Sequence, residues 1–246
     1  VLACADFPHV ETALAESGRG VERFGTSARA DWRATGLRDE GGRTRFEVRL
    51  AGGIETELGI LAMGEMNARN ALGVFALCRR LGLSVEEIRP GLESFRGVRR
   101  RQEALCDGPI VVIDDFAHHP TAIAGTIEAV RRRYAGKKLW AVFEPRSNTS
   151  RRRVFQKEFA DALRGASAAV IASVFFKETD PLPEAERLSV VELVADLRAG
   201  GVAAETFPDA DSILAHLLRE VRPGDVVVFM SNGAFGGLPQ RFAERV

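Results

Sequence analysis

The sequence of 246 residues is poor in cysteine, and the pattern of its three cysteines excludes two kinds of protein. Cys4, Cys78 and Cys106 are odd in number and far apart along the chain. They therefore fit neither a disulfide framework nor a zinc-binding pair. We expect three reduced thiols, which is typical of a cytosolic protein.

The sequence also lacks an excess of charge and any long apolar run. Lys+Arg and Asp+Glu both number 34, so composition gives no argument for a nucleic-acid partner or an anionic membrane surface. Apolar stretches such as 226–230 are far shorter than the roughly 20 residues of a membrane-spanning helix. The opening segment contains Asp6 and His9 without a basic start, so no signal peptide is predicted. Because it begins inside an apolar run and without methionine, we expect a piece of a longer protein.

Two nucleotide-binding motifs are missing as well. No GxxxxGK[ST] sequence occurs, so the chain contains no recognisable loop for a triphosphate. The glycine-rich run SNGAFGG at 231–237 lacks the GxGxxG spacing and does not follow a first strand, so it favours a tight turn over a dinucleotide-binding loop.

From about residue 108 onward, apolar runs alternate with helical patterns. Apolar residues at spacings of four, three and four indicate a helix after the first run: Ile123, Ile127, Val130 and Tyr134. Thr121 is the expected N-cap of this helix. Strands are predicted at 110–113, 139–143, 168–173, 202–207 and 225–230. Because these runs are apolar throughout, we expect an α/β fold with a Rossmann-like, mostly parallel sheet and helices on both faces.

The first part of the chain has a different pattern. Residues 46–50 alternate apolar and polar side chains, as a half-exposed antiparallel strand does, and 70–82 and 85–95 have helical spacing. We place the boundary near 95–97, which divides the chain into residues 1–94 and 95–246.

Two polar segments follow strands directly: DDFAHHPT at 114–121 and EPRSNT at 144–149. Ligands of open α/β sheets bind at the carboxyl ends of the strands, so these segments predict a binding edge. Two carboxylates and two imidazoles in the first segment could also bind a metal. Their spacing matches no metal motif, and we predict no metal site.

Other polar runs allow two interpretations each. In GEMNARN at 64–70, the two asparagines either cap a helix or bind a nucleotide on one helix face. The arginines at 99–101 favour a solvated surface, and those at 131–133 fit the carboxyl end of a helix. The arginines at 151–153 either lie in solvent or face an anion.

Three motifs together carry a resemblance: GxxNxxN at 64–70, FxGxxRR at 95–101 and DDFAHHPT at 114–121. In this order they resemble the Mur ligases, the ATP-dependent enzymes that form amide bonds in peptidoglycan synthesis. The resemblance covers nearly the whole chain, since ADFP at 5–8 is similar to the end of a central-domain strand in that family. Met66 departs from the family, which often has histidine at this position.

The resemblance implies a domain assignment. Residues 1–94 would be the last part of a central α/β ATPase domain, and 95–246 a complete C-terminal, Rossmann-like, peptide-binding domain. The UDP-binding domain and the phosphate loop, with most magnesium ligands, would belong to other parts of the same protein. The chain by itself is therefore expected to be inactive.

Within the family, EPRSNT at 144–149 resembles the branch that recycles murein peptide. Such enzymes join UDP-N-acetylmuramate to the tripeptide L-alanyl-γ-D-glutamyl-meso-diaminopimelate through an acyl phosphate, using ATP and magnesium in the bacterial cytoplasm. Two alternatives stay open: a ligase that adds L-alanine to UDP-N-acetylmuramate, and a non-catalytic module that binds a nucleotide or peptide.

The resemblance also implies roles for individual residues. Asn67, Asn70, Arg101 and Asp115 would lie around ATP, with Arg101 and Asp115 as the catalytic pair. The incoming peptide would meet His118, His119, Arg146, Ser147, Asn148 and Thr149. Asp115 is the expected functional acid, because neighbouring side chains of a strand point to opposite sides. Asp114 is then expected to bond to the backbone or to cap a helix.

Overall fold

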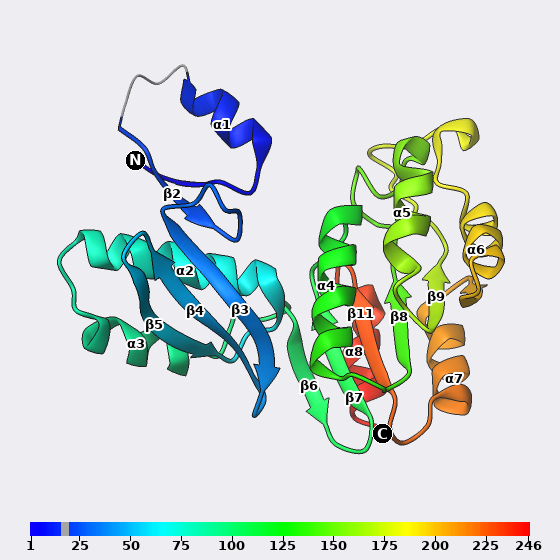
Figure 1. Ribbon diagram of the computed structural model, residues 1–246. Helices are drawn as coiled ribbons and strands as arrows, with labels where there is room; N and C mark the ends of the chain where they lie inside the picture. Colours follow the sequence, from blue (N-terminus) through cyan, green and yellow to red (C-terminus); the bar gives the residue numbers. More distant parts are fainter. Residues whose placement is uncertain (16–19) are drawn as a thin grey trace. The chain divides into compact units, whose positions relative to one another are not determined.

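The computed structural model describes residues 1–15 and 20–246. These residues divide into two compact units, Val1–Gly97 and Val98–Val246 (Figure 1). Each unit has its own sheet, and each is described by itself. Within the described residues, no helix is long and apolar enough to cross a lipid bilayer.

The sheet of the first unit has five strands in the order β1-β2-β3-β4-β5. The first three strands are parallel, whereas β4 is antiparallel to β3 and β5. This confirms the antiparallel strand expected at 46–50. The elements are β1 (Leu2–Cys4), α1 (Pro8–Ala15), β2 (Glu22–Gly25), β3 (Trp32–Glu40), β4 (Arg43–Leu50), β5 (Gly53–Ile60), α2 (Gly64–Arg80) and α3 (Val85–Ser94).

Helix α2 begins six residues before the predicted start. Its N-cap is Met63, which makes no capping hydrogen bond through its side chain. Asn67 and Asn70 therefore lie inside the helix, and their interpretation as N-caps is wrong. The buried face of α2 carries apolar residues such as Leu72 and Phe75, which pack with Phe46 of β4 in the core of this unit.

The sheet of the second unit has six strands in the order β10-β9-β8-β11-β7-β6. All neighbouring pairs are parallel except β6 with β7, which confirms the predicted mostly parallel sheet. The strands are β6 (Glu103–Asp107), β7 (Val111–Asp115), β8 (Leu139–Phe143), β9 (Ala168–Ala172), β10 (Ala203–Phe207) and β11 (Val226–Met230). The antiparallel edge strand β6 has no counterpart in the prediction, because its sequence EALCD is neither alternating nor continuously apolar.

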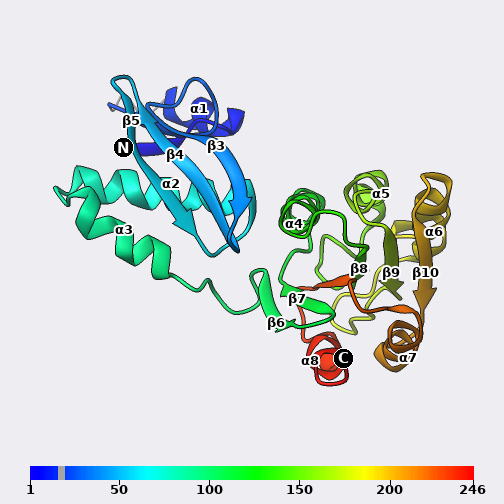
Figure 2. The ribbon, with the colours of Figure 1, turned by 60° about the horizontal axis from the view of Figure 1, so that its bottom comes forward.

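Helices cover both faces of this sheet, as predicted. α4 (Pro120–Arg133) and α5 (Gln156–Leu163) lie on one face, and α7 (Ala210–Glu220) and α8 (Leu238–Ala243) on the other (Figure 2). α6 (Val190–Ala199) packs beside α5. The five residues of β7, β8, β9 and β11 are buried throughout, because each strand is covered from both sides.

Two local predictions near β7 are wrong. Asp114 and Asp115 are the last residues of the strand, where we expected a loop. The N-cap of α4 is His119, whose side chain accepts a hydrogen bond from the Thr121 amide, so Thr121 is not the cap. The helix starts earlier than we predicted, because Pro120 occupies its first position. The backbone N–H at this position has no acceptor within the helix, so proline, which has no N–H, is tolerated there.

Candidate functional site

The candidate site lies at the carboxyl ends of three central strands in the second unit. β11 lies between β8 and β7, and Met230 at its end is in register with Phe143 on one side and Asp115 on the other. The segments that follow these strands therefore start at one edge of the sheet, which is where open α/β sheets bind ligands. The same strand order inserts the run 231–237 between the two predicted polar segments.

Asp115 is buried at this edge, and backbone amides hold its carboxylate. The amide of Gln102 donates to Oδ2 at 2.8 Å, and the amide of Ala117 donates to Oδ1 at 2.6 Å. Burial raises the pKa of Asp115 above its ordinary value, while the two amides and the nearby Arg101 oppose this rise. Arg101 itself is exposed, with its guanidinium carbon 4.8 Å from the centre of the Phe116 ring. The carboxylate fastens the turn before β6 to the end of β7.

Asp114 is also buried and pairs with Arg100. The Nε of Arg100 lies 3.2 Å from Oδ2 of Asp114, and its Nη2 donates to the carbonyls of Ser231 at 2.8 Å and Gly233 at 2.6 Å. One guanidinium thus joins β7 to the segment after β11. Arg100 has a φ of 58°, which is uncommon for a residue other than glycine and often marks a functional position. We expected Asp114 to bond to the backbone or to cap a helix; instead its carboxylate pairs with the guanidinium of Arg100, and the backbone amides bond to Asp115.

Arg146 lies in a cluster that links the ends of β8 and β11. Its Nη1 lies 3.7 Å from Oε1 of Glu144, and the other carboxylate oxygen of Glu144 accepts a hydrogen bond from the Ser231 hydroxyl. The guanidinium carbon of Arg146 is 3.7 Å from the centre of the Phe175 ring. Gly233 packs so closely on Arg146 that a Cβ there would lie 2.9 Å from the guanidinium carbon. About a third of the side chain of Arg146 is exposed, 34%, so a ligand can contact it.

The two histidines of the first polar segment have different surroundings. His118 is half-buried, with Nδ1 2.8 Å from the carbonyl oxygen of Phe116. His119 is exposed, caps α4 and packs edge-on to Phe155 at 5.0 Å between ring centres. Over residues 1–15 and 20–246, no group of three or more His, Cys, Asp or Glu side chains could hold a metal ion.

The three residues after Arg146 also differ in accessibility. Ser147 is buried, and its hydroxyl lies 2.9 Å from that of Ser150 in a tight turn. Asn148 and Thr149 are exposed. The structure therefore leaves two of these three predicted peptide contacts open to solvent and encloses the third.

The arginines at 151–153 all pair with carboxylates. Their partners are Asp180 for Arg151, Glu186 and Asp180 for Arg152, and Glu192 for Arg153. These pairs contradict the interpretation that the run faces an anion.

In the first unit, Asn67 and Asn70 lie on α2. The Nδ2 of Asn67 donates to the carbonyl of Met63 at 2.9 Å, and Asn70 is exposed. Between them, Arg69 donates to Oδ2 of Asp6 at 3.0 Å, which attaches the helix to the end of β1. The two carboxamides stay candidates for nucleotide contacts.

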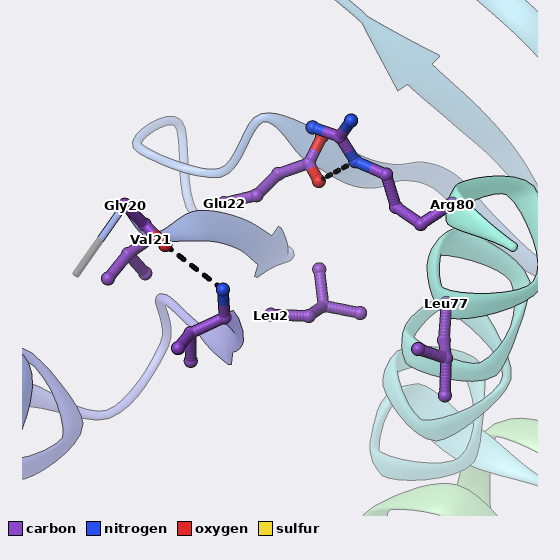
Figure 3. Close-up of a pocket in the computed structure, with 7 residues that line it drawn as sticks. Leu2, Gly20, Val21, Glu22, Leu77 and Arg80 are labelled. Carbon is purple, nitrogen blue, oxygen red and sulfur yellow. Dashed lines mark hydrogen bonds and ion pairs between the residues drawn. The ribbon is translucent and has the colours of Figure 1, made fainter.

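The first unit also contains a cavity of about 630 Å³ beside β1, β2 and α2 (Figure 3). Its polar contacts are the ion pair of Glu22 with Arg80 and a 3.0 Å hydrogen bond from the Val1 ammonium to the Gly20 carbonyl. Leu2 and Leu77 contribute apolar surface. The residues that line it include no predicted site residue.

Four residues of the edge in the second unit were not assigned from the sequence: Arg100, Phe175, Ser231 and Gly233. Arg100 belongs to a charged run that the sequence favours as surface, and Phe175 lies in a loop distant along the chain. The signal for the other two was the run SNGAFGG directly after a strand, which is a plausible turn in any protein. Only the position of β11 between β7 and β8 gives this run a place in the site.

The environment of Asp115 leads to a first prediction. We expect Asp115→Asn to lower the free energy of unfolding by about 1–3 kcal/mol, because the Asn side chain has one acceptor oxygen where the carboxylate has two, and it can satisfy only one of the two backbone amides. Urea unfolding measures this effect.

The raised pKa adds a pH signature to this prediction. Around the raised value the folded state holds a proton that the unfolded state has released, so the free energy of unfolding falls as pH rises. Subtracting the Asp115→Asn curve from the wild-type curve should isolate this negative slope. A difference curve that rises with pH through that window would contradict the assignment of burial as the dominant influence.

Comparison with known proteins finds relatives that share one name. The chain is 34% identical to a UDP-N-acetylmuramate–L-alanine ligase of Halorhodospira halophila over 243 residues, covering 96% of this chain and 49% of the relative. It is 36% identical to the ligase of the same name from Acidothermus cellulolyticus, over 95% of this chain and 49% of the relative. The chain therefore spans about half the length of these relatives.

Solved structures of two ligases also match this chain. A UDP-N-acetylmuramate–alanine ligase from Thermotoga maritima shares the fold, with a TM-score of 0.80 at 24% identity, covering 100% of this chain and 51% of that one. A murein peptide ligase from Psychrobacter arcticus matches with a TM-score of 0.63 at 28% identity, again over 100% and 51%. The family model for the Mur ligase, glutamate ligase domain, matches residues 100–233, which is more than half of the chain. The chain belongs to the Mur ligase family.

Proposed function

We propose that the intact protein is an ATP-dependent ligase that joins UDP-N-acetylmuramate to the tripeptide L-alanyl-γ-D-glutamyl-meso-diaminopimelate. The observation that carries this proposal is the environment of Arg146. Its guanidinium is held beside Phe175 and Gly233 at the carboxyl end of β8, with a third of the side chain exposed. A planar guanidinium held in this way suits bidentate recognition of a carboxylate, and the tripeptide offers several.

Residues around Arg146 support a peptide acceptor. Asn148 and Thr149 are exposed on the same loop and can donate or accept hydrogen bonds from peptide groups. His118 and His119 follow the neighbouring β7 and are proposed to contact the same acceptor. Ser147 is enclosed in its turn, so we propose that it shapes the loop.

ATP is the second substrate of the proposed reaction. ATP transfers its γ-phosphoryl group to the lactyl carboxylate, which gives ADP and an acyl phosphate. The acceptor amine then attacks the carboxyl carbon, displaces inorganic phosphate and loses a proton as the amide forms. We propose that Arg101 stabilises phosphate charge and that Asp115 accepts hydrogen bonds from the ribose, while Asn67 and Asn70 contact the nucleotide from α2. We propose that magnesium is held mainly by parts of the protein outside this chain, together with the phosphates of ATP.

The domain assignment is part of the same proposal. We propose that residues 1–94 complete a central ATPase domain and that 95–246 form the peptide-binding C-terminal domain. UDP binding and the phosphate loop would then be supplied by further segments of the protein. We expect no phosphate release from the 246-residue chain alone, because it has no GxxxxGK[ST] sequence.

A second candidate is supported by the relatives themselves. Those at 34% and 36% identity are named as ligases for L-alanine, and free L-alanine also carries a carboxylate that Arg146 can bind. The two candidates differ only in the acceptor. A non-catalytic binding module is the third candidate, and it predicts no acceptor-dependent turnover.

The test of the proposed function is an acceptor comparison with the intact protein. UDP-N-acetylmuramate and ATP are supplied with either tripeptide or free L-alanine, and phosphate release and ligated product are measured. We expect turnover with tripeptide and little with L-alanine. The reverse preference would select the second candidate, and no turnover with either acceptor would select the binding module.

A further inference from the structure

The loop between β9 and α6 approaches Arg146 from a distant part of the sequence. Residues 174–188, here called the 174–188 loop, carry Phe175. The amide of Phe175 donates to the carbonyl of Pro145 at 3.1 Å, which fastens its backbone beside the β8 segment. Its ring then lies 3.7 Å from the guanidinium carbon of Arg146. Phe175 is therefore held next to Arg146 by both its backbone and its ring.

The middle of the 174–188 loop is held by an arginine that is almost completely buried. Arg151 has 2% of its side chain exposed, and its guanidinium pairs with the Asp180 carboxylate. The Nη1 of Arg151 also donates to the carbonyl of Asp180 at 3.1 Å. Further along, the amide of Leu188 donates to the carbonyl of Arg151 at 2.9 Å. A single residue thus attaches the loop at two positions.

Apolar packing alone does not explain how this loop is fixed. A cavity of about 50 Å³ lies between Arg151 and the loop, and its lining includes Phe175 and Leu182. Phe176, next to Phe175, is 63% exposed. Burying an arginine costs desolvation free energy that an ion pair can fail to offset, so this pair is weak evidence for stability. Its contacts with the carboxylate and the carbonyl of Asp180 instead hold the 174–188 loop at one point of its path.

We propose that the Arg151–Asp180 ion pair and Phe175 are positioning elements for acceptor recognition: the ion pair fixes the 174–188 loop, and Phe175 orients the guanidinium of Arg146 toward the acceptor carboxylate. This inference rests on the proposed function, because it assigns Arg146 to the acceptor. Phe175 does not touch the reacting atoms. Its contribution is to restrict Arg146 to one pose, so that less side-chain entropy is lost when the carboxylate binds.

The kinetic test uses the intact protein and four variants. Phe175→Ala and Asp180→Asn should raise the KM for the acceptor about 5- to 30-fold, the range of a cation–π contact of this kind. The KM for ATP should stay within about twofold. Phe175→Tyr keeps an aromatic face and should restore the acceptor KM. Glu186→Gln is the matched control for Asp180→Asn, because Glu186 lies on the same loop but pairs with the surface residue Arg152, and it should leave both KM values unchanged.

A second readout does not depend on the acceptor's identity. Phenylglyoxal modifies accessible arginines, and mass spectrometry can follow the rate at Arg146 in the intact protein. We expect faster modification of Arg146 in Phe175→Ala and in Asp180→Asn, and an unchanged rate in Glu186→Gln. If Asp180→Asn does not fold, Phe175→Ala still tests the pose of Arg146.

The outcomes separate this inference from the proposed function. If the wild type uses L-alanine and not tripeptide, the proposed function is wrong, and the inference is judged by the KM for L-alanine and by labelling. The inference about Phe175 would be overturned if a folded Phe175→Ala variant had an unchanged KM for the acceptor and an unchanged rate of Arg146 labelling. An equal rise in the KM values for acceptor and ATP would also overturn it, because the loop would then support the fold and not the acceptor.

Discussion

Under the proposed function, Arg146→Ala in the intact protein is expected to raise the KM for the tripeptide about 30- to 150-fold while leaving the KM for ATP nearly unchanged. Truncating one partner of a hydrogen-bonded charge pair costs about 2–5 kcal/mol. We take the lower part of that range, about 2–3 kcal/mol, because 34% of the Arg146 side chain is exposed and solvent weakens the pair. Steady-state kinetics with each substrate varied in turn measures the effect.

Two companion variants sharpen this prediction. Arg146→Lys keeps the charge but loses the planar fork, so it should recover only part of the affinity. Gly233→Ala would place a Cβ 2.2 Å from the Cδ atom of Arg146, so the side chain of Arg146 must leave its pose, and we expect a raised acceptor KM. Gly125→Ala is its control: Gly125 lies in α4 with open space at its Cβ position. Equal effects of Arg146→Ala on both KM values would mean that Arg146 supports the fold.

Arg100→Ala is expected to destabilise the second unit by about 3 kcal/mol. The change leaves the Asp114 carboxylate, 2% exposed, without its guanidinium partner, and it removes the donor to the Ser231 and Gly233 carbonyls. Breaking a buried pair on one side typically costs about 3–5 kcal/mol, and the partial exposure of Arg100 favours the lower value. For a unit of this size we expect a fall in Tm of about 6–12 °C.

The measurement needs a probe that reports on the second unit alone. The chain has two tryptophans, Trp32 in the first unit and Trp140 in the second, so Trp140 fluorescence in a Trp32→Phe background serves this purpose. Arg99→Ala is the control, because Arg99 is exposed beside Arg100, and surface substitutions change stability by about 0.5 kcal/mol or less.

A double variant tests the cause of the Arg100 effect. Adding Asp114→Asn to Arg100→Ala removes the unpaired buried charge, so the double variant should be more stable than Arg100→Ala alone. Burial raises the pKa of Asp114, and Arg100 opposes this rise. Without Arg100, the folded state should keep the Asp114 proton to a higher pH than the unfolded state does. The free energy of unfolding of Arg100→Ala should therefore fall as pH rises. Losses that simply add in the double variant would show that Asp114 and Arg100 do not interact.

The sequence by itself determined the class of the second unit and the edge at which to look for a site. Continuous apolar runs such as 139–143 alternate with helical patterns, and this pattern requires a sheet covered on both faces whatever the strand order. Because parallel strands all end at the same edge, Asp115 and Arg146 could be assigned to one edge from their positions after strands. The pattern of apolar residues along the chain therefore predicts both the fold class and the edge of the sheet, without knowledge of the strand order.

Only the tertiary structure decided which groups meet at that edge. The insertion of β11 between β7 and β8 brings Gly233 to Arg146 and the carbonyl of Ser231 to Arg100, contacts that span up to 131 positions of the chain. From the sequence we expected Asp114 to bond to the backbone, but the turn that carries Gln102 places the backbone amide on Asp115. In the same way, Arg151 has the sequence context of a surface charge, and its burial depends on Asp180 in a loop that no local pattern positions. Such contacts depend on strand order and loop path, which are set by the packing of the whole unit and not by any short stretch of sequence.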